Sequence, residues 1–399
     1  MNSYPNIIIS YKGETFIRNG QNKMYANNLE SYDTNINDGD IVNIMTQDKE
    51  YLATGFFNSH SHIAVRILTR DFHQEIDLSF FKQRLLDAYN YRKTVMSDNL
   101  DNCRLVFGDA DGMPGLVIDR YNDILVSQIS ILGLESIKDD IYKLMLEILK
   151  EDHQDISRVY ERNDVVIRKK EGLSLYKGWA VGNGDTTTII KENNLLLQVD
   201  IENGQKTGYF LDQKNNRLLV RNIAKDKKVL DCFTHTGGFA LNAAMGHAEK
   251  VVGVDVSETA LSQARHNAKL NNLDNVEFVQ ADVFDYLETL KKGQYDLIIL
   301  DPPAFTKSRS TVNKAYNGYK RINYLALKAL KSGSYLITCT CSRYMEIDTF
   351  EDMLKEASKE ANVSLKQISV SLQSPDHPTL EEDTSTTYLK FYMFQVIRS

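Results

Sequence analysis

Four apolar segments in the C-terminal half of the chain run into an aspartate. The first, Val229–Phe239, has the pattern of a buried strand, a glycine turn and the start of a helix. Its acid is Asp231, and Asp255, Asp282 and Asp301 follow at the ends of the next three segments. The carboxyl ends of parallel strands meet at one edge of a sheet, where ligands of doubly wound folds bind. The spacing therefore predicts a parallel sheet with a nucleotide-type ligand along that edge.

The C-terminal region alternates strand and helix patterns. Strands are expected near 228–232, 250–255, 276–280, 296–301 and 334–340, and helices near 238–247, 257–271, 283–291 and 317–331. Two last strands, 365–372 and 388–396, are expected to close the sheet antiparallel. This alternation predicts an α/β domain with a Rossmann-like fold over residues 181–399.

Two different patterns precede that domain. Residues 1–73 contain short strand-like runs between turns, beginning with a strand over 7–11, which is typical of a small β-barrel. Residues 74–180 mix two amphipathic helices, 80–96 and 137–149, with a hairpin of strands 116–121 and 124–129. We therefore expect a central α+β domain. A basic run, Arg158–Lys170, is either a nucleic-acid-binding patch or a solvated strand face.

Charge and composition narrow the classes of protein. A net charge of −7 argues against indiscriminate nucleic-acid binding, which depends on a large positive field. No apolar run approaches the roughly 20 residues that span a membrane, and the N-terminus has no signal-peptide core, so the cytoplasm is expected. The chain has four cysteines, too few to predict a disulfide scaffold. Two of them form a Cys-x-Cys pair, Cys339 and Cys341, but no second such pair or His-x-His lies nearby, so no metal site is predicted.

The predicted ligand is S-adenosylmethionine. Gly237 and Gly238 permit a tight turn close to a ligand, while the G-x-G-x-x-G fingerprint of dinucleotide folds is absent. Asp255 would accept the ribose hydroxyls, and Asp282 the adenine amino group. Asp231 would flank the methionine portion. The alternative is that each acid only caps a helix. The full predicted cofactor set is Tyr209, Asp212, Gln213, Asp231, Phe233, Thr236, Gly237, Asp255, Val256, Asp282, Val283 and Asp301.

Some of these residues come from a segment that precedes the sheet. Residues 204–217 read as a loop followed by a helix start, with Asp212 as the N-cap. The segment is either a lid over the methyl donor or an ordinary capped helix.

The reacting groups are predicted at the ends of two further strands. Asp301–Pro303 forms a rigid loop after the fourth strand, where Asp301 could hold the edge of a base. Cys341 ends the next strand at the same edge. A thiolate that adds to carbon 6 of a pyrimidine makes carbon 5 nucleophilic, whereas an amino group needs no such help. Cys341 is therefore the predicted nucleophile, in preference to Cys339, and carbon 5 of a pyrimidine is the predicted target.

A base inside a duplex cannot present carbon 6 to a thiol, so the substrate should be single-stranded or flipped-out RNA. Cytosine and uracil are not distinguished by these residues. Methylation of a base amino group, and a non-catalytic RNA-binding assembly factor, are the alternatives. A homodimer is left open.

The chain resembles the PUA-domain-containing ribosomal RNA large-subunit cytosine-C5 methyltransferases along nearly its whole length. The matching segments are Tyr160–Val165, Arg168–Gly172, Lys206–Gln213, Phe233–Phe239, Asp301–Pro303, Cys341–Met345 and Asp376–Pro378. The resemblance implies an N-terminal PUA barrel, a central α+β domain and a class I methyltransferase domain. It also implies ribosomal RNA as partner, Cys341 as nucleophile and Asp301 on the cytosine. A His-Pro-Trp-type stretch of the family is replaced here by Gln21–Asn27, and Ala304 replaces a basic residue.

Overall fold

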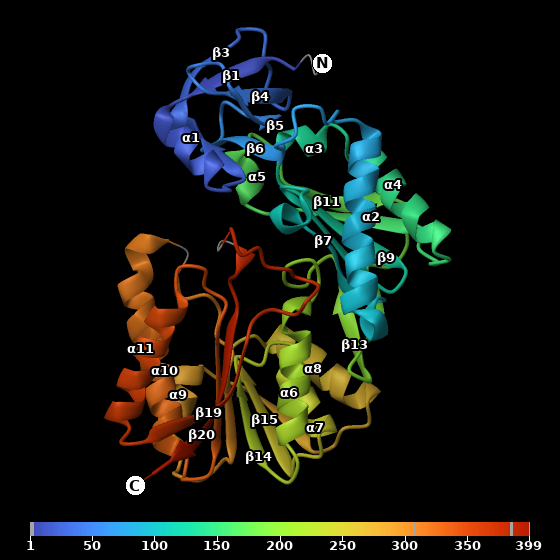
Figure 1. Ribbon diagram of the computed structural model, residues 1–399. Coiled ribbons are helices and arrows are strands. Elements are labelled where there is room, and N and C mark those ends of the chain that lie inside the picture. Colours follow the sequence, from blue (N-terminus) through green and yellow to red (C-terminus); the bar gives the residue numbers. More distant parts are fainter. Residues whose placement is uncertain (1–3, 307, 384–385, 399) are drawn as a thin grey trace. The chain divides into compact units, whose positions relative to one another are not determined.

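The computed structural model describes residues 4–306, 308–383 and 386–398, and Figure 1 colours the chain from blue to red. The chain divides into two compact units, and each unit is built from separate segments. Unit 1 comprises Met1–Ile190, Val199–Leu211 and Pro375–Thr386. Unit 2 comprises Lys191–Gln198, Asp212–Ser374 and Thr387–Ser399. Two of the boundaries between the units fall inside the hairpin of β12 (Thr187–Glu192) and β13 (Leu195–Asp200).

Unit 1 begins with a small six-stranded sheet around its own apolar core. In spatial order its strands are β2 (Lys23–Tyr25), β6 (Ile63–Thr69), β5 (Tyr51–Phe57), β4 (Ile41–Met45), β1 (Asn6–Ile9) and β3 (Leu29–Tyr32). Ile7, Val42 and Val65 are fully buried at its centre. The predicted set of short N-terminal strands is confirmed.

One element of this region was not predicted. The chain turns into helix α1 (Tyr11–Arg18) where the sequence pattern indicated a strand as far as residue 11. The Ser10 side chain accepts a hydrogen bond from Gly13 N at 3.3 Å and so caps the helix. Apolar periodicity over so few residues does not reveal such a cap.

The rest of unit 1 is a five-stranded sheet with helices. The strands lie in the order β11 (Tyr176–Val181), β10 (Arg158–Asn163), β9 (Ile124–Ile129), β8 (Leu116–Tyr121) and β7 (Asn102–Phe107). The helices are α2 (Leu78–Val95), α3 (Leu132–Glu135), α4 (Lys138–Glu151) and α5 (Ile167–Lys170). The β8–β9 hairpin turns at Asn122 with φ of 55°, a left-handed conformation that asparagine tolerates. This is the predicted α+β region.

Unit 2 contains a seven-stranded sheet. Its strands are, in spatial order, β16 (Val276–Gln280), β15 (Lys250–Asp255), β14 (Lys228–Cys232), β17 (Leu297–Leu300), β18 (Tyr335–Thr340), β20 (Lys390–Ile397) and β19 (Ser364–Ser371). The helices are α6 (Lys214–Ile223), α7 (Gly238–Met245), α8 (Glu258–Leu270), α9 (Val283–Glu288), α10 (Val312–Ala329) and α11 (Ile347–Glu360). The first five of these strands, β16, β15, β14, β17 and β18, run parallel, and β20 and β19 close the sheet antiparallel as predicted.

Apolar cores cover both faces of this sheet. Helices α9, α10 and α11 pack on one face and α6 and α7 on the other, as Figure 1 shows. Strands buried on both faces need continuous apolar runs, such as Leu297–Leu300, and the sequence supplies them. The Rossmann-like α/β prediction is therefore confirmed. Polar groups gather where the parallel strands end, and the candidate site lies there.

A buried ion pair in unit 1 gives the first prediction. Arg104 Nε and Nη2 donate to the two oxygens of Asp119 at 2.8 and 2.9 Å, and both side chains are buried. Asp119→Ala leaves a buried guanidinium without its carboxylate, so we expect a loss of about 3–5 kcal/mol in the free energy of unfolding. Urea unfolding followed by fluorescence of Trp179, the single tryptophan, measures this loss because Trp179 lies in the same sheet.

The matched control is Lys82→Ala, which breaks an exposed ion pair with Glu151. Exposed ion pairs contribute little to the free energy of unfolding, so the urea midpoint of Lys82→Ala should stay near that of the parent. An Asp119→Ala midpoint as high as that of the control would contradict the prediction.

Candidate functional site

The carboxyl edge of the unit 2 sheet brings four predicted residues together. Asp231 lies in β14, Asp255 ends β15, and Asp301 and Cys341 follow β17 and β18. The strands are parallel and in near register: Cys232 pairs with Val254 and with Leu300. Residues that are far apart in the chain therefore meet at one edge, as the sequence pattern predicted.

A strained turn follows β14. Phe233, His235 and Gly237 have φ of 63°, 50° and 83°, so the backbone is left-handed at three of five consecutive residues. Asp231 Oδ2 stabilises the turn, because it accepts hydrogen bonds from Thr234 Oγ1 at 2.5 Å and from Ala240 N at 2.9 Å. The same carboxylate therefore shapes the turn and fixes the first turn of α7.

The other oxygen of Asp231 is unsatisfied. Oδ1 is buried and has no hydrogen-bond partner among the described residues. Burial raises the pKa of Asp231 to about 7, and the negative charges of Asp301 and Asp255 add to the effect. A cationic ligand with an N–H donor would satisfy this oxygen and offset the repulsion between the carboxylates. The ammonium group of S-adenosylmethionine would supply the N–H donor, and its sulfonium group would add positive charge.

Asp255 is held rigidly at the next strand end. Its Oδ2 accepts from His235 N and its Oδ1 from Ser257 N, both at 2.9 Å. Each carboxylate oxygen keeps a lone pair, so hydroxyl donors can still bind. Beside it, Val256 is 62% exposed. An acid next to an exposed apolar side chain suits a nucleoside, whose ribose is polar and whose base is flat and apolar on its faces.

The structure gives Asp282 a helix-capping role. Its Oδ1 accepts from Phe284 N at 2.8 Å and from Asp285 N at 3.3 Å, at the start of α9. Val283 packs into the core under the sheet, and Thr236 is half-buried in the turn after β14. The contacts of these three residues with a cofactor stay predictions.

Gln213 is oriented toward Asp301 by a chain of hydrogen bonds. Ser371 Oγ donates to Asn216 Oδ1 at 2.6 Å, and Asn216 Nδ2 donates to Gln213 Oε1 at 2.7 Å. The Gln213 amide nitrogen is thereby directed to Asp301 Oδ1, at 3.1 Å. Each amide passes its orientation to the next, so Gln213 can only donate to Asp301.

The prediction that Asp212 caps a helix is wrong. Residues Leu211–Gln213 form a 3₁₀ turn, and α6 begins at Lys214 without a side-chain cap. The Asp212 carboxylate accepts instead from Tyr388 Oη at 2.6 Å. This partner is distant in the chain, which is why local sequence patterns did not reveal it.

The proposed lid segment is divided between the two units. Tyr209 belongs to unit 1, where its backbone N donates to Tyr121 Oη at 3.2 Å. Thr207 is fully buried there and donates to Asp119 Oδ2 at 2.5 Å. Residues 199–211 are therefore anchored within unit 1 by buried hydrogen bonds.

Cys341 is half-buried at the end of β18. Its Sγ lies 4.0 Å from the carbonyl oxygen of Pro302, in the loop that carries Asp301. Ser342 Oγ donates to Thr306 O at 2.9 Å and ties the same two loops together. Side chains of the loop after β18 thus bind backbone carbonyls of the loop after β17, which holds the nucleophile candidate close to the loop that carries Asp301.

Aromatic side chains pack against the loops that follow β17 and β18. The rings of Phe305 and Tyr319 are 4.6 Å apart, and Tyr319 Oη accepts from Thr340 Oγ1 at 2.9 Å. Tyr319 is fully buried in α10, and a Cβ on Gly318 would lie 3.1 Å from the Phe305 ring. The packing fixes the loop after β17 relative to the end of β18.

The other three cysteines are buried. Burial raises the pKa of Cys232 and of Cys339 well above the usual thiol range, so both stay protonated. Cys339 packs in the core on the α6–α7 face, and Cys103 lies in the core of unit 1. Of the four thiols, only that of Cys341 has access to solvent.

The interpretation of Arg158–Lys170 as one basic patch is wrong in part. Arg168 is fully buried and pairs with Glu135, while Arg162 is buried and pairs with Asp164. The segment after β10 is helix α5 rather than a strand. Buried guanidinium groups that are already paired with carboxylates are not available to a phosphate.

Lys390 is a residue of this edge that the sequence analysis missed. It is buried at the start of β20, and its Nζ donates to Ser342 O at 3.3 Å. A lysine between apolar residues near the C-terminus carries no local signal of such a position.

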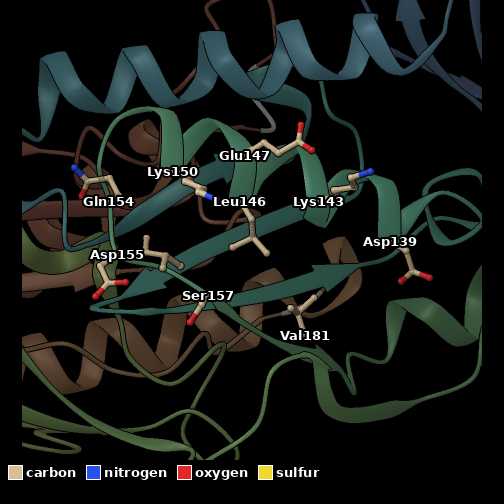
Figure 2. Close-up of a pocket in the computed structure, with 10 residues that line it drawn as sticks. Asp139, Lys143, Leu146, Glu147, Lys150, Gln154, Asp155, Ser157 and Val181 are labelled. Carbon is tan, nitrogen blue, oxygen red and sulfur yellow. The ribbon is translucent and has the colours of Figure 1, made fainter.

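A hollow of about 580 Å³ lies elsewhere, in unit 1 (Figure 2). Its lining mixes Lys143 and Lys150 with Asp139, Glu147 and Asp155. Among residues 4–306, 308–383 and 386–398, no group of three or more histidine, cysteine or acidic side chains could hold a metal. No helix in the same ranges is long and apolar enough to cross a membrane.

Comparison with known proteins places this geometry in a family. Residues 160–394 match the S-adenosylmethionine-dependent methyltransferase family, and residues 7–70 match a PUA-like domain. Proteins named ribosomal RNA large subunit methyltransferase I, from Shigella dysenteriae serotype 1 and Escherichia coli O157:H7, are each 38% identical over 365 residues. The match covers 90% of this chain, 90% of the Shigella protein and 91% of the Escherichia protein.

Solved structures share the fold over the full length. A methyltransferase structure in complex with S-adenosylhomocysteine has a TM-score of 0.81 at 22% identity, and one from Streptococcus mutans has 0.79 at 22%. Each match covers 98% of this chain and 99% of the other. With the strand-end acids, the unsatisfied Asp231 oxygen and these matches together, the chain belongs to the S-adenosylmethionine-dependent methyltransferases and carries an N-terminal PUA-like domain.

Proposed function

We propose that this protein methylates carbon 5 of a cytosine in large-subunit ribosomal RNA, with Cys341 as a covalent nucleophile. The carrying observation is the half-buried thiol beside the Asp301 loop. It lies at the carboxyl edge of the sheet, where ligands of doubly wound folds bind. Relatives that are 38% identical are named for the ribosomal RNA of the large subunit, which supports the substrate class. The resemblance noted from the sequence supports cytosine as the base.

S-adenosylmethionine supplies an electrophilic methyl group when it is bound. Asp231 would accept a hydrogen bond from the ammonium group, and Asp255 would accept the ribose hydroxyls. Val256 would cover one face of the adenine. The remaining predicted contacts are those of Tyr209, Asp212, Gln213, Phe233, Thr236, Gly237, Asp282, Val283 and Asp301.

Cys341 makes carbon 5 reactive. Its thiolate adds to carbon 6 of the base, so a carbon–sulfur bond forms and the electron pair of the C5–C6 double bond moves toward carbon 5. After carbon 5 has gained its methyl group, the hydrogen on carbon 5 leaves as a proton and passes to water. The electrons of that C–H bond then restore the double bond, and the thiolate leaves. The cysteine is regenerated unchanged.

Asp301 would orient the base. Its Oδ1 accepts a hydrogen bond from the Gln213 amide. A carboxylate accepts several hydrogen bonds at once, so it could also accept from the exocyclic amino group of cytosine. Uracil has a carbonyl at that position, which a carboxylate would repel. This arrangement favours cytosine over uracil, the alternative base.

The RNA must present the base outside a duplex. We propose that the PUA-like region (1–73) and the central α+β region (74–180) bind the RNA, and that residues 181–399 carry out methyl transfer. A ribosomal substrate would place the activity in the cytoplasm. A homodimer stays a prediction, which light scattering would test.

The first prediction for this site concerns the nucleophile. Cys341→Ala should reduce 5-methylcytosine formation in ribosomal RNA by at least about 10⁴-fold, because the covalent route is lost. Mass spectrometry of product nucleosides measures it and separates methylcytosine from methyluracil. RNA containing 5-fluorocytosine should give a denaturation-resistant adduct with the parent and none with Cys341→Ala.

Cys103→Ala is the control, because that thiol is buried in unit 1. Amino-group methylation that persists in Cys341→Ala would contradict the proposal. A parent protein that binds RNA but transfers no methyl group would favour the assembly-factor alternative.

The second prediction concerns the ribose acceptor. Asp255→Ala should weaken S-adenosylhomocysteine binding by at least about tenfold, because two charge-assisted hydrogen bonds are lost. Calorimetry measures the affinity directly. Asp274→Ala, an exposed acid that precedes β16 at the opposite edge, should bind as the parent does. Equal affinities for Asp255→Ala and Asp274→Ala would remove Asp255 from the site.

The third prediction is a pH dependence set by Asp231. Its pKa is raised to about 7, so its contribution to folding stability is full below the ordinary value of 3.8 and is lost as pH rises to about 7. Binding of a cation has the opposite sign, because it requires the ionised form. Affinity for S-adenosylhomocysteine should therefore fall about tenfold from about pH 8 to about pH 6. Asp231→Asn should abolish this slope, and a pH-independent parent would refute the assignment.

A further inference from the structure

Lys390 is a buried cation at the carboxyl edge of the sheet. It is 3% exposed, and it pairs with Thr340 where β20 lies beside β18. Thr340 is the residue that immediately precedes Cys341. Its side chain therefore lies on the α10–α11 face together with Thr340 and reaches the loop after β18. The proposed methyl transfer does not by itself use the Lys390 ammonium.

The partners of the ammonium are neutral. Nζ donates to Ser342 O at 3.3 Å and to Tyr388 O at 3.5 Å, and among the described residues no carboxylate forms a salt bridge with it. Burying an ammonium without an anion is costly, and proteins pair or neutralise such groups. Two carbonyl oxygens accept hydrogen bonds from the ammonium group, but neither carries a charge that compensates it.

The neighbouring titratable groups identify the missing anion. Burial lowers the pKa of Lys390 to about 8, while the negative charges of Glu346 and Cys341 act against that shift. Glu346 is exposed, so water screens it. Burial raises the pKa of Tyr319 far above neutrality and that of Cys339 well above the thiol range, so neither is an anion. Asp301 lies in the loop after β17, where its Oδ1 accepts a hydrogen bond from the Gln213 amide, and its charge is not among those that act on Lys390.

We propose that Lys390 is a positioning residue whose ammonium serves as counter-ion to the Cys341 thiolate and whose hydrogen bond to Ser342 O holds the loop that carries the sulfur. The inference rests on the proposed role of Cys341 and extends it. No proton moves between the two groups in this arrangement. The ammonium stays protonated while the thiolate adds to the base, and it stabilises the thiolate again when the carbon–sulfur bond breaks.

The test measures the thiol itself, without RNA or cofactor. Alkylation of Cys341 by iodoacetamide is followed by peptide mass spectrometry as a function of pH, because only the thiolate reacts. In Lys390→Met the midpoint of the curve should rise by about one pH unit or more, while the plateau rate at high pH stays unchanged. Lys390→Arg should restore the midpoint.

A second neutral variant separates charge from loop geometry. Lys390→Gln can still donate to a carbonyl but has no charge, so its midpoint should match that of Lys390→Met. A Lys390→Gln midpoint equal to the parent's would overturn the proposal. A change in the plateau alone, which reports access to the sulfur, would show a merely structural role and also overturn it. Lys331→Met, which removes an exposed lysine bound to Asp296 at the amino edge, should leave the curve unmoved.

Turnover gives an independent readout. At pH near 7, Lys390→Met should lower kcat for methyl transfer by about tenfold or more, in proportion to the lost thiolate, with unchanged affinity for S-adenosylhomocysteine. The two proposals fail separately. An unmoved alkylation curve refutes the role of Lys390 and leaves Cys341 as nucleophile. Full activity in Cys341→Ala refutes the nucleophile, whatever the alkylation curve shows.

Discussion

The buried carboxylate of Asp231 is the constraint on which the site depends. One oxygen binds Thr234 and Ala240, and so fixes the turn after β14 and the start of α7. The other oxygen has no partner among the residues that the structure describes, and Asp255 and Asp301 repel its charge. A buried group of this kind is stable as an anion only beside a cation. The residue that builds the turn therefore also sets the charge of the ligand that the turn can hold.

The proposed chemistry of the site depends on the loops after β17 and β18, which are held together by direct contacts. Ser342 joins the loop after β18 to the loop after β17, and Tyr319 supports both, through Thr340 and through the ring of Phe305. These contacts hold Cys341 beside the loop that carries Asp301 and leave the Cys341 sulfur partly exposed. The nucleophile proposed here would attack the base and later leave it, so it would need both a fixed position and access to its substrate. The proposed Lys390 counter-ion adds the third requirement, a stabilised thiolate.

Sequence patterns located most strands and helices because apolar periodicity reflects burial directly. The hairpin at Asn122, the alternation of strands and helices in unit 2 and the antiparallel end pair all followed from such patterns. The errors have one cause. Ser10 ended a strand early through a local cap, Asp212 bound Tyr388 instead of capping α6, and Arg168 turned inward to Glu135. Each depends on a hydrogen bond or ion pair whose partner the local pattern does not specify.

The amino-acid sequence by itself determined the parallel sheet, the acids at its carboxyl edge and the identity of the candidate nucleophile. These follow from residue type and spacing, because parallel strands bring their ends together wherever the helices pack. Only the tertiary structure decided which polar groups are satisfied. It left one oxygen of Asp231 without a partner, directed the amide of Gln213 toward Asp301 and buried Lys390 against the loop of Cys341. Such pairings join residues that are distant in the chain, and their energies depend on burial, which no local pattern encodes.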